Sequence, residues 1–346
     1  MSDIRHDPID DLWVAMADNR RERPMEFIPV EQIRKQIICP FCKGNEQETP
    51  AAVAAYSDRG TPLNGDDWHT SDQWTCRVVN NKYPSFSTRE AQSNDARPSG
   101  NEFSPTNGHL TSSIHAPGIQ ELIIPSPRHV SSLSELIDEE LETSFVAQRD
   151  RLQAFRQLDF VKHGMLFMNC RSAAGASLGH IHWQLIGTPL VSDNLKRRCQ
   201  RNQVSRDQRG QSIIRTLLDW ELEQDKRVLR KTDHFVMMCP FASRFPLQVR
   251  IIPLDPGTPF VELDEAPRNE LAWLCRDVVL RLEDLLDKPA YNILLHGPPF
   301  EIDNTDDWYV EIFPRLTTAA GFELGTDVWV NPVTPETAAR ALRAAV

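Results

Sequence analysis

The order of predicted elements occurs twice along the chain, and this repetition constrains the fold more than any other feature. Each copy consists of two strands, a helix and two further strands. The expected ranges are 74–79, 120–125, 132–155, 164–169 and 180–189 in one copy, and 235–239, 249–253, 267–286, 291–295 and 308–314 in the other. An internal duplication accounts for this pattern. It predicts an α+β fold with antiparallel sheets and a crossing helix in each half. We expect halves over 1–190 and 191–346, with the polar, basic segment 191–210 as a linker or an excursion.

Two histidines and a glutamine occupy alternate positions in the last strand of the first copy: His180, His182 and Gln184. Side chains alternate between the faces of a strand, so these three side chains should share one face, with Trp183 on the other. Three hydrogen-bonding groups in a row indicate a functional face. The competing interpretation is an edge strand whose polar face is solvated.

A pair of cysteines, Cys39 and Cys42, encloses Pro40 and Phe41 in a short turn. Two thiolates at this spacing can hold one edge of a tetrahedral zinc site. A redox dithiol has the same spacing, but it usually opens a helix, whereas the residues that follow here indicate a loop. The chain has no second pair of this kind, so the remaining zinc ligands must be histidines from elsewhere.

The composition is that of an ordinary soluble globular protein, with 40% hydrophobic and 25% charged residues among 346. The formal net charge of −11 and the lack of a long basic run exclude a broad nucleic-acid surface. No apolar run approaches the roughly 20 residues of a membrane span. The N-terminus has no apolar signal segment, so we expect a cytoplasmic protein without membrane or nucleic-acid partners. Seven mostly scattered cysteines do not indicate a disulfide framework.

Several motifs, in their order and spacing, resemble the galactose-1-phosphate uridylyltransferase family, the transferase branch of the histidine-triad superfamily. The resemblance spans nearly the whole chain. The motifs that carry it are His180-Ile181-His182-Trp183-Gln184, the preceding Asn169 and Gly175-Ala176-Ser177, Cys39-Pro40-Phe41-Cys42, Asn81-Lys82-Tyr83-Pro84, Ser126-Pro127-Arg128-His129 and Ala320-Gly321-Phe322-Glu323. It implies two histidine-triad-like halves, a homodimer and a zinc ion in the first half.

The resemblance also implies roles for individual residues. It makes Cys39, Cys42, His129 and His180 the ligands of one structural zinc per chain. It makes His182 the nucleophile that attacks the α-phosphorus of a UDP-sugar, forming a uridylyl-histidine intermediate that a second hexose 1-phosphate then resolves. A neutral imidazole is a competent nucleophile near pH 7. We expect its ring to be exposed in a phosphate-binding pocket, with a backbone carbonyl near His180 fixing its tautomer.

The remaining roles concern the phosphates, the nucleotide and the sugar. Gln184 and Ser177 would donate to the phosphoryl oxygens, together with backbone N–H groups of the loop of small residues at 172–177. The other residues that match nucleotide- or phosphate-binding positions are Arg20, Arg23, Asn81, Lys82, Asn169, Gly175 and Ala176. Taken alone, the arginines would indicate only a solvated loop. Phe322 and Glu323 match a sugar-binding segment that acts partly across the dimer interface.

Departures from the family pattern leave the substrate open. Thr317 and Thr318 replace a Lys-Phe pair of the well-known enzymes, and residues 307–309 lack the His-x-His of a second metal site. We therefore expect His296, which remains of that set, to be packed or hydrogen-bonded. Two alternatives to the uridylyltransferase remain. One is an ADP-sugar or dinucleoside-polyphosphate phosphorylase with the same covalent intermediate, and the other is a non-catalytic, zinc-stabilised nucleotide-binding protein.

Overall fold

The computed structural model describes most of the chain with its side chains and three further strands by their backbone only. Side chains are described for 38–63, 73–86, 118–255, 257–302 and 308–345, and backbone alone for β1 (Asp3–Asp7), β2 (Leu12–Met16) and β5 (Ser112–His115). These three strands form a small antiparallel sheet in the order β2-β1-β5. Arg20 and Arg23 lie outside the described residues.

A ten-stranded antiparallel sheet forms the centre of the molecule, in the order β3-β4-β6-β8-β7-β12-β13-β11-β10-β9. Its strands are β3 (Ala52–Tyr56), β4 (Cys76–Asn80), β6 (Ile119–Ile124), β7 (His163–Cys170), β8 (Trp183–Thr188), β9 (Val228–Lys231), β10 (Phe235–Met238), β11 (Val249–Pro253), β12 (Tyr291–His296) and β13 (Tyr309–Pro314). From each edge inward, the order of one half repeats that of the other, β3-β4-β6-β8-β7 against β9-β10-β11-β13-β12. The predicted α+β duplication is confirmed.

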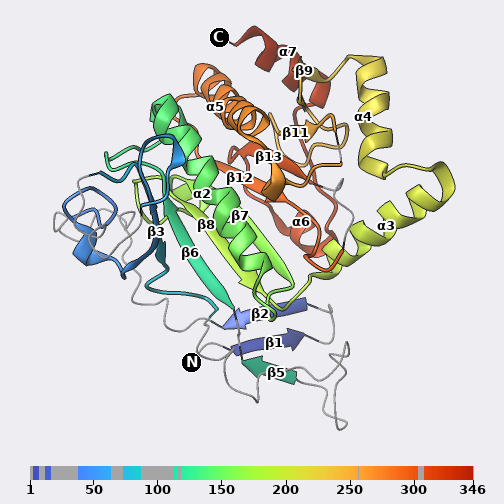
Figure 1. Ribbon diagram of the computed structural model, residues 1–346. Coiled ribbons are helices and arrows are strands. Elements are labelled where there is room, and N and C mark those ends of the chain that lie inside the picture. The colour runs from blue at the N-terminus through green and yellow to red at the C-terminus, as the bar shows by residue number, and fades with distance from the viewer. Residues whose placement is uncertain are drawn as a thin grey trace.

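Two long helices, α2 (Asp138–Arg156) and α5 (Glu265–Leu285), cross one face of the sheet, one in each half (Figure 1). Their apolar residues recur at helical spacing and face the strands. The buried members are Leu141, Phe145, Leu152 and Phe155 in α2, and Leu271, Leu274, Val278 and Leu282 in α5. The opposite face of the sheet carries two smaller hydrophobic clusters, one in each half, together with polar side chains.

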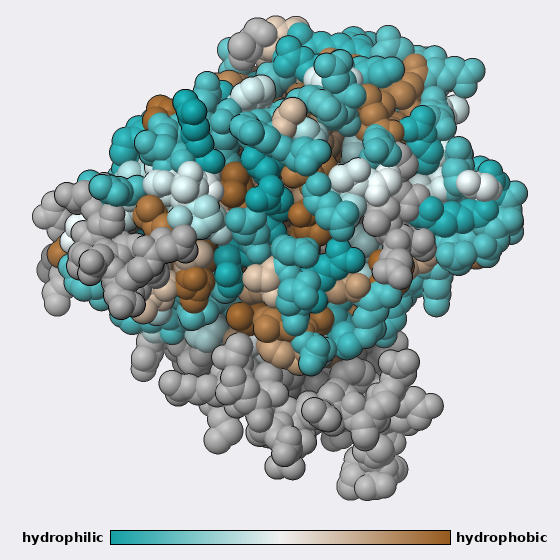
Figure 2. All heavy atoms as spheres, in the orientation of Figure 1, coloured by the Kyte–Doolittle hydropathy of each residue, from teal (hydrophilic) through white to brown (hydrophobic). Residues whose placement is uncertain are grey.

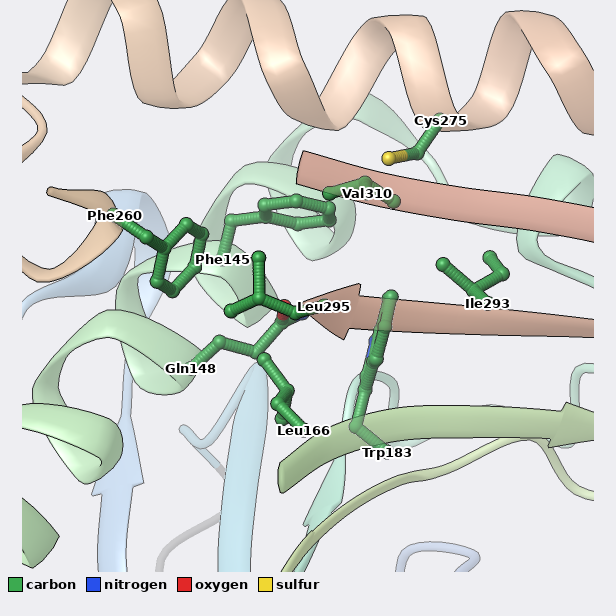
Figure 3. A pocket seen from close by; sticks show the side chains of 9 residues that line it. All are labelled: Phe145, Gln148, Leu166, Trp183, Phe260, Cys275, Ile293, Leu295 and Val310. Carbon is green, nitrogen blue, oxygen red and sulfur yellow. The ribbon is translucent and has the colours of Figure 1, made fainter. Parts of the chain in front are cut away.

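The two halves share one hydrophobic core. β7 pairs with β12, so the sheet continues across the seam between the halves. Figure 3 shows a small void at this seam, lined by Phe145 and Trp183 from the first half and by Ile293, Leu295 and Val310 from the second. The boundary at residue 190 remains a prediction, since the sheet and the core both cross from one half into the other.

Two local features add to what the sequence indicates. The segment 191–210, expected to be a linker or an excursion, contains helix α3 (Asp193–Arg209), whose N-terminus is capped by the Ser192 hydroxyl. Only a few residues of α3 are buried, so it lacks the apolar periodicity that would have revealed it. In addition, β8 begins at Trp183, so His180 and His182 lie in the segment that leads into the strand.

Three shorter helices complete the described structure: α4 (Ile213–Gln224), α6 (Gly321–Thr326) and α7 (Pro335–Ala344). The face seen in Figure 2 is mostly hydrophilic, and its hydrophobic residues form separate patches. Among the described residues, no helix combines the length and the apolarity needed to cross a membrane.

Candidate active site

Two cysteines and two histidines from three separate segments meet in one cluster, made of Cys39, Cys42, His129 and His180. Their ligand atoms all lie within 4.8 Å of one another. The Nδ1 atom of His180 is 3.6 Å from the Cys39 sulfur and 3.7 Å from the Cys42 sulfur, and Nδ1 of His129 is 3.4 Å from the latter. This is the only such group among the residues that the structure describes.

The separations between these atoms fit a tetrahedral zinc. Bond lengths of about 2.3 Å to sulfur and about 2.0 Å to nitrogen, at a tetrahedral angle, separate the two atoms by about 3.5 Å. The three sulfur–nitrogen distances lie between 3.4 and 3.7 Å. Two thiolates and two imidazoles are also a donor set that zinc prefers. Three of the six separations thus match a tetrahedral site, and the four residues could hold one zinc ion.

Backbone hydrogen bonds bring the three segments of this cluster together. The N–H of Lys43 donates to the carbonyl of Pro127 at 3.0 Å, which ties the cysteine turn to the segment before His129. The N–H of Ile181 donates to the carbonyl of Val130 at 2.9 Å, which ties the segment of His180 to that of His129. Burial, aided by the neighbouring His129, lowers the pKa of His180 to about 3, so this ring is neutral at pH 7.

His182 lies beside this cluster with a defined tautomer. Its Nδ1 atom is 3.0 Å from the backbone carbonyl of His180. A carbonyl oxygen only accepts, so Nδ1 carries a proton, and in the neutral ring Nε2 is the nitrogen with the lone pair. The predicted tautomer contact is present. The expected exposure is wrong, because His182 is 2% exposed and Phe41 of the cysteine turn packs against its ring at 5.0 Å between centroids.

Gln184 follows on β8 and is held by a second amide. Its Oε1 atom accepts a hydrogen bond of 3.2 Å from Nε2 of Gln120 on β6. The Oε1 atom of Gln120 in turn accepts from the N–H of Ser85 at 3.0 Å. Both glutamines are buried, at 3% and 4% exposure. The Nε2 group of Gln184 is thus the part of its side chain that can donate to a ligand.

The small-residue loop 171–177 is shaped by internal hydrogen bonds. The N–H groups of Ala174 and Ala176 donate to the carbonyl of Arg171, and the N–H of Gly175 donates to Ser172. The expected backbone donors at Gly175 and Ala176 are therefore already engaged within the loop. Gly175 has a φ of +91°, a left-handed conformation that favours glycine.

Asn292, from the second half, holds this loop and the neighbouring Asn169. Its Nδ2 atom donates to Asn169 Oδ1 at 2.8 Å and to the carbonyl of Ala174 at 2.9 Å. Arg171 adds a second link, because its guanidinium donates to the carbonyl of Pro289 at 2.5 Å. The second half thus fixes the loop that carries Ser177, which is itself buried.

The structure distributes the other predicted site residues differently. Asn81 is hydrogen-bonded to β6, because its backbone N–H donates to the carbonyl of Gln120 at 2.8 Å. The next residue, Lys82, is exposed. Phe322 and Glu323 lie on α6 in the second half. Phe322 is 57% exposed, and the Glu323 carboxylate accepts from the N–H of Ala320 at the start of its own helix.

The corresponding face of the second half contains a buried ionic network in place of ligands. Nε2 of His296 donates to the Glu311 carboxylate at 3.2 Å, and its ring stacks on Tyr309. Burial lowers the pKa of His296, so this ring is neutral at pH 7. Burial alone would raise the pKa of Glu311, but the hydrogen bond from His296 and the charges of Arg250 and Arg244 hold it well below its ordinary value. His296 is hydrogen-bonded, as predicted.

Sequence reasoning missed three residues of the site: Phe41, Gln120 and Asn292. For Phe41 the available signal is a large apolar side chain inside a metal-binding turn, which indicates a packing role. Gln120 is a polar residue in an otherwise apolar strand, which is an available signal. For Asn292 there is no local signal, since it belongs to the other half.

Comparisons with known proteins agree with this geometry. A family model described as "Domain of unknown function (DUF4921)" matches residues 132–345, which is more than half of the chain. ADP-glucose phosphorylase of Arabidopsis thaliana is 28% identical over 99% of this chain and 92% of its own length. Galactose-1-phosphate uridylyltransferase of Thermotoga maritima is 25% identical over 99% of this chain and 98% of its own length.

A solved structure extends the likeness to three dimensions. The crystal structure of an ADP-glucose phosphorylase from Arabidopsis thaliana with bound ADP-glucose superposes with a TM-score of 0.74 and 27% identity. The match covers 100% of this chain and 99% of that one. The chain thus belongs to the DUF4921 family and, with it, to the wider galactose-1-phosphate uridylyltransferase-like family.

Proposed function

We propose that the protein transfers a nucleotidyl group from a nucleotide sugar by double displacement through His182. Membership of this family makes it an enzyme of nucleotidyl transfer. The observation that carries the proposal is the hydrogen bond from Nδ1 of His182 to the carbonyl of His180, which assigns the role of nucleophile to Nε2 in the neutral ring.

In the first step, the Nε2 lone pair attacks the α-phosphorus, an Nε2–P bond forms, and the P–O bond to the β-phosphate breaks. Hexose 1-phosphate leaves with the electron pair of that bond. In the second step, an acceptor phosphate oxygen attacks the same phosphorus and releases His182. Gln184, Ser177 and Asn169 offer side-chain donors for the charge that develops on the phosphoryl oxygens. His182 is 2% exposed, so the substrate would contact only a small part of its ring.

The metal cluster supports this chemistry without taking part in it. A zinc ion bound by the two thiolates and two imidazoles would supply a rigid link between the cysteine turn and residue 180. The carbonyl of residue 180 orients the ring of His182. The cluster would therefore position the nucleophile, and all four of its ligand positions are filled by protein.

For the donor, the comparisons favour ADP-glucose with inorganic phosphate as acceptor, which would make the protein an ADP-sugar phosphorylase. The second candidate is the predicted UDP-glucose:hexose-1-phosphate uridylyltransferase, supported by the relative from Thermotoga maritima. In both cases a homodimer would complete the site. The exposed apolar residues Phe322 and Leu324 of α6 support a contact with a second copy there, since they are 57% and 77% exposed.

Incubation with ADP-glucose or UDP-glucose labelled at the α-phosphate tests the proposal. Wild-type protein should retain the label, and the donor that labels it identifies the nucleotide. His182→Ala should retain none. His234→Ala is the matched control, because His234 is a partly exposed histidine that pairs with Glu270 in the second half. No label from either donor would leave a non-catalytic nucleotide-binding protein.

A further inference from the structure

Four side-chain amides lie on one face of four neighbouring strands. They are Gln120 on β6, Gln184 on β8, Asn169 on β7 and Asn292 on β12, and the sheet places these strands in that order. Gln184 is paired with Phe167, two residues before Asn169, and Asn169 is paired with Asn292. Since side chains alternate along a strand, all four amides project from the face opposite α2.

The first pair of amides has a polarity that backbone chemistry determines. The N–H of Ser85 can only donate, so the atom of Gln120 that meets it must be the carbonyl oxygen. The other end of Gln120 is then its NH2 group, which donates to Gln184. Gln184 must therefore turn its oxygen toward Gln120 and its NH2 group away from it.

The second pair follows the same logic with the opposite backbone group. The carbonyl of Ala174 can only accept, so the atom of Asn292 that meets it must be the NH2 group. The same NH2 group donates to Asn169, which must turn its oxygen toward Asn292. The Nδ2 atom of Asn169 then faces the loop, where it lies 3.6 Å from the position that a Cβ atom would take on Gly175.

We propose that Gln120 and Asn292 are positioning residues that fix the orientation of two phosphate-facing amides. Each holds the oxygen of its partner amide, so that Gln184 and Asn169 both present NH2 groups to the phosphates of the nucleotide sugar. An amide turned the other way would place its oxygen against a phosphate oxygen, where the two repel. This proposal deepens the proposed function, on which it rests for the identity of the ligand.

Substitutions that reverse the hydrogen-bond polarity of a positioning residue test the proposal. Gln120→Glu and Asn292→Asp keep the size of the side chain but can no longer donate to the partner amide, which then turns its NH2 group toward the new carboxylate. Loss of one preorganised donor lowers kcat by on the order of 100-fold, and we expect a loss of that size for each variant. Gln120→Met and Asn292→Leu leave the partner amide without a bias, so they should lose several-fold less activity.

A double-mutant cycle distinguishes positioning from a merely structural role. In a Gln184→Met background, Gln120→Glu should have little further effect on the labelling rate, because the group through which it acts is absent. In an Asn169→Leu background, Asn292→Asp should keep only the part of its effect that comes from the lost hydrogen bond to the Ala174 carbonyl. Gln208→Glu, on the exposed side of α3, controls for the added charge. Additive losses of activity in the double mutant would overturn the proposal. Losses of activity that follow the fall in Tm equally in Gln120→Glu and Gln120→Met would also overturn it.

A binding measurement separates this proposal from the proposed function. The Kd of ADP, measured by calorimetry, should rise at least tenfold in Gln120→Glu and in Asn292→Asp, whether or not a covalent intermediate forms. Equal affinity in wild type and in both variants overturns the positioning roles. If wild type takes no label but the variants bind ADP more weakly, the covalent mechanism is wrong and the positioning roles stand.

Discussion

Replacing Gly175 by alanine should reduce activity far more than stability, and a second glycine provides the control. Gly175 and Gly210 have φ values of +91° and +76°, so both hold the left-handed conformation. A Cβ atom on Gly175 would lie 3.6 Å from Nδ2 of Asn169, whereas one on Gly210 would meet nothing within 4 Å. Alanine at either position would therefore strain the backbone, but only alanine at position 175 would contact the candidate site.

The expected loss of stability follows from the backbone. A non-glycine residue in this conformation costs roughly 1–2 kcal/mol. The smaller conformational freedom of alanine in the unfolded chain offsets about 0.4–1 kcal/mol of that cost. The net loss is about 1 kcal/mol. For 346 residues, an unfolding entropy of ~2.1 cal/mol/K per residue gives ~0.7 kcal/mol per degree, so Tm should fall by about 1–2 °C in either variant.

The expected loss of activity follows from the position of the added methyl group. In Gly175→Ala the methyl group occupies the space beside the Asn169 donor, where a phosphate oxygen would approach. A misplacement of about 1 Å can cost ~100-fold, so kcat/KM should fall by at least ~10-fold. Gly210→Ala should keep wild-type kcat/KM. Equal activities of the two variants, measured as phosphate-dependent release of ADP from ADP-glucose, would refute the role given to this loop.

Three further predictions concern the metal, the second half and the core. Metal analysis should find one zinc per chain, and chelation or Cys42→Ser should lower Tm; two zinc ions or none would contradict the cluster. Glu311→Gln should lower the free energy of unfolding by about 2 kcal/mol at neutral pH, measured with denaturant. The neutral amide no longer forms ion pairs with Arg244 and Arg250, which are partly exposed. Since the pKa of Glu311 is depressed, this contribution is present above the ordinary carboxylate pKa and is lost as pH falls below it. The difference between the two proteins should therefore shrink in acid, and a constant difference would argue against an ionised carboxylate. Gly187→Ala should cost about 1–3 kcal/mol, because its Cβ atom would lie 2.7 Å from Phe155 and 3.0 Å from Val161; an unchanged Tm would show that the core yields there.

Much of the site could be predicted because its signals are local. Alternation along one segment indicated that His182 and Gln184 share a face, and the spacing of Cys39 and Cys42 indicated half of a metal site. The repeated order of elements predicted the duplication. The first two inferences need only a short stretch of sequence, and the third needs only the order of elements that are each identified locally.

The features that escaped prediction depend on contacts between distant segments. The pairing of β7 with β12 joins Asn169 to Asn292, and no local pattern shows which strand edges of two similar halves will meet. The burial of His182 depends on Phe41, which the cysteine turn brings to it from more than a hundred residues away. Helix α3 escaped for another reason, because a largely exposed polar helix has no apolar stripe to reveal it.

The link from Asn292 to the loop of the first half also bears on the history of such a duplicated chain. A copy without a ligand set among its described residues would ordinarily be free to accumulate changes or to disappear. Here that copy supplies the neighbour of β7 and the amide that grips Asn169 and Ala174. Selection for chemistry in the first copy therefore also preserves β12 of the second copy, although this strand carries no reacting group. Deleting the second copy would expose the edge of β7, and an open sheet edge is prone to aggregation.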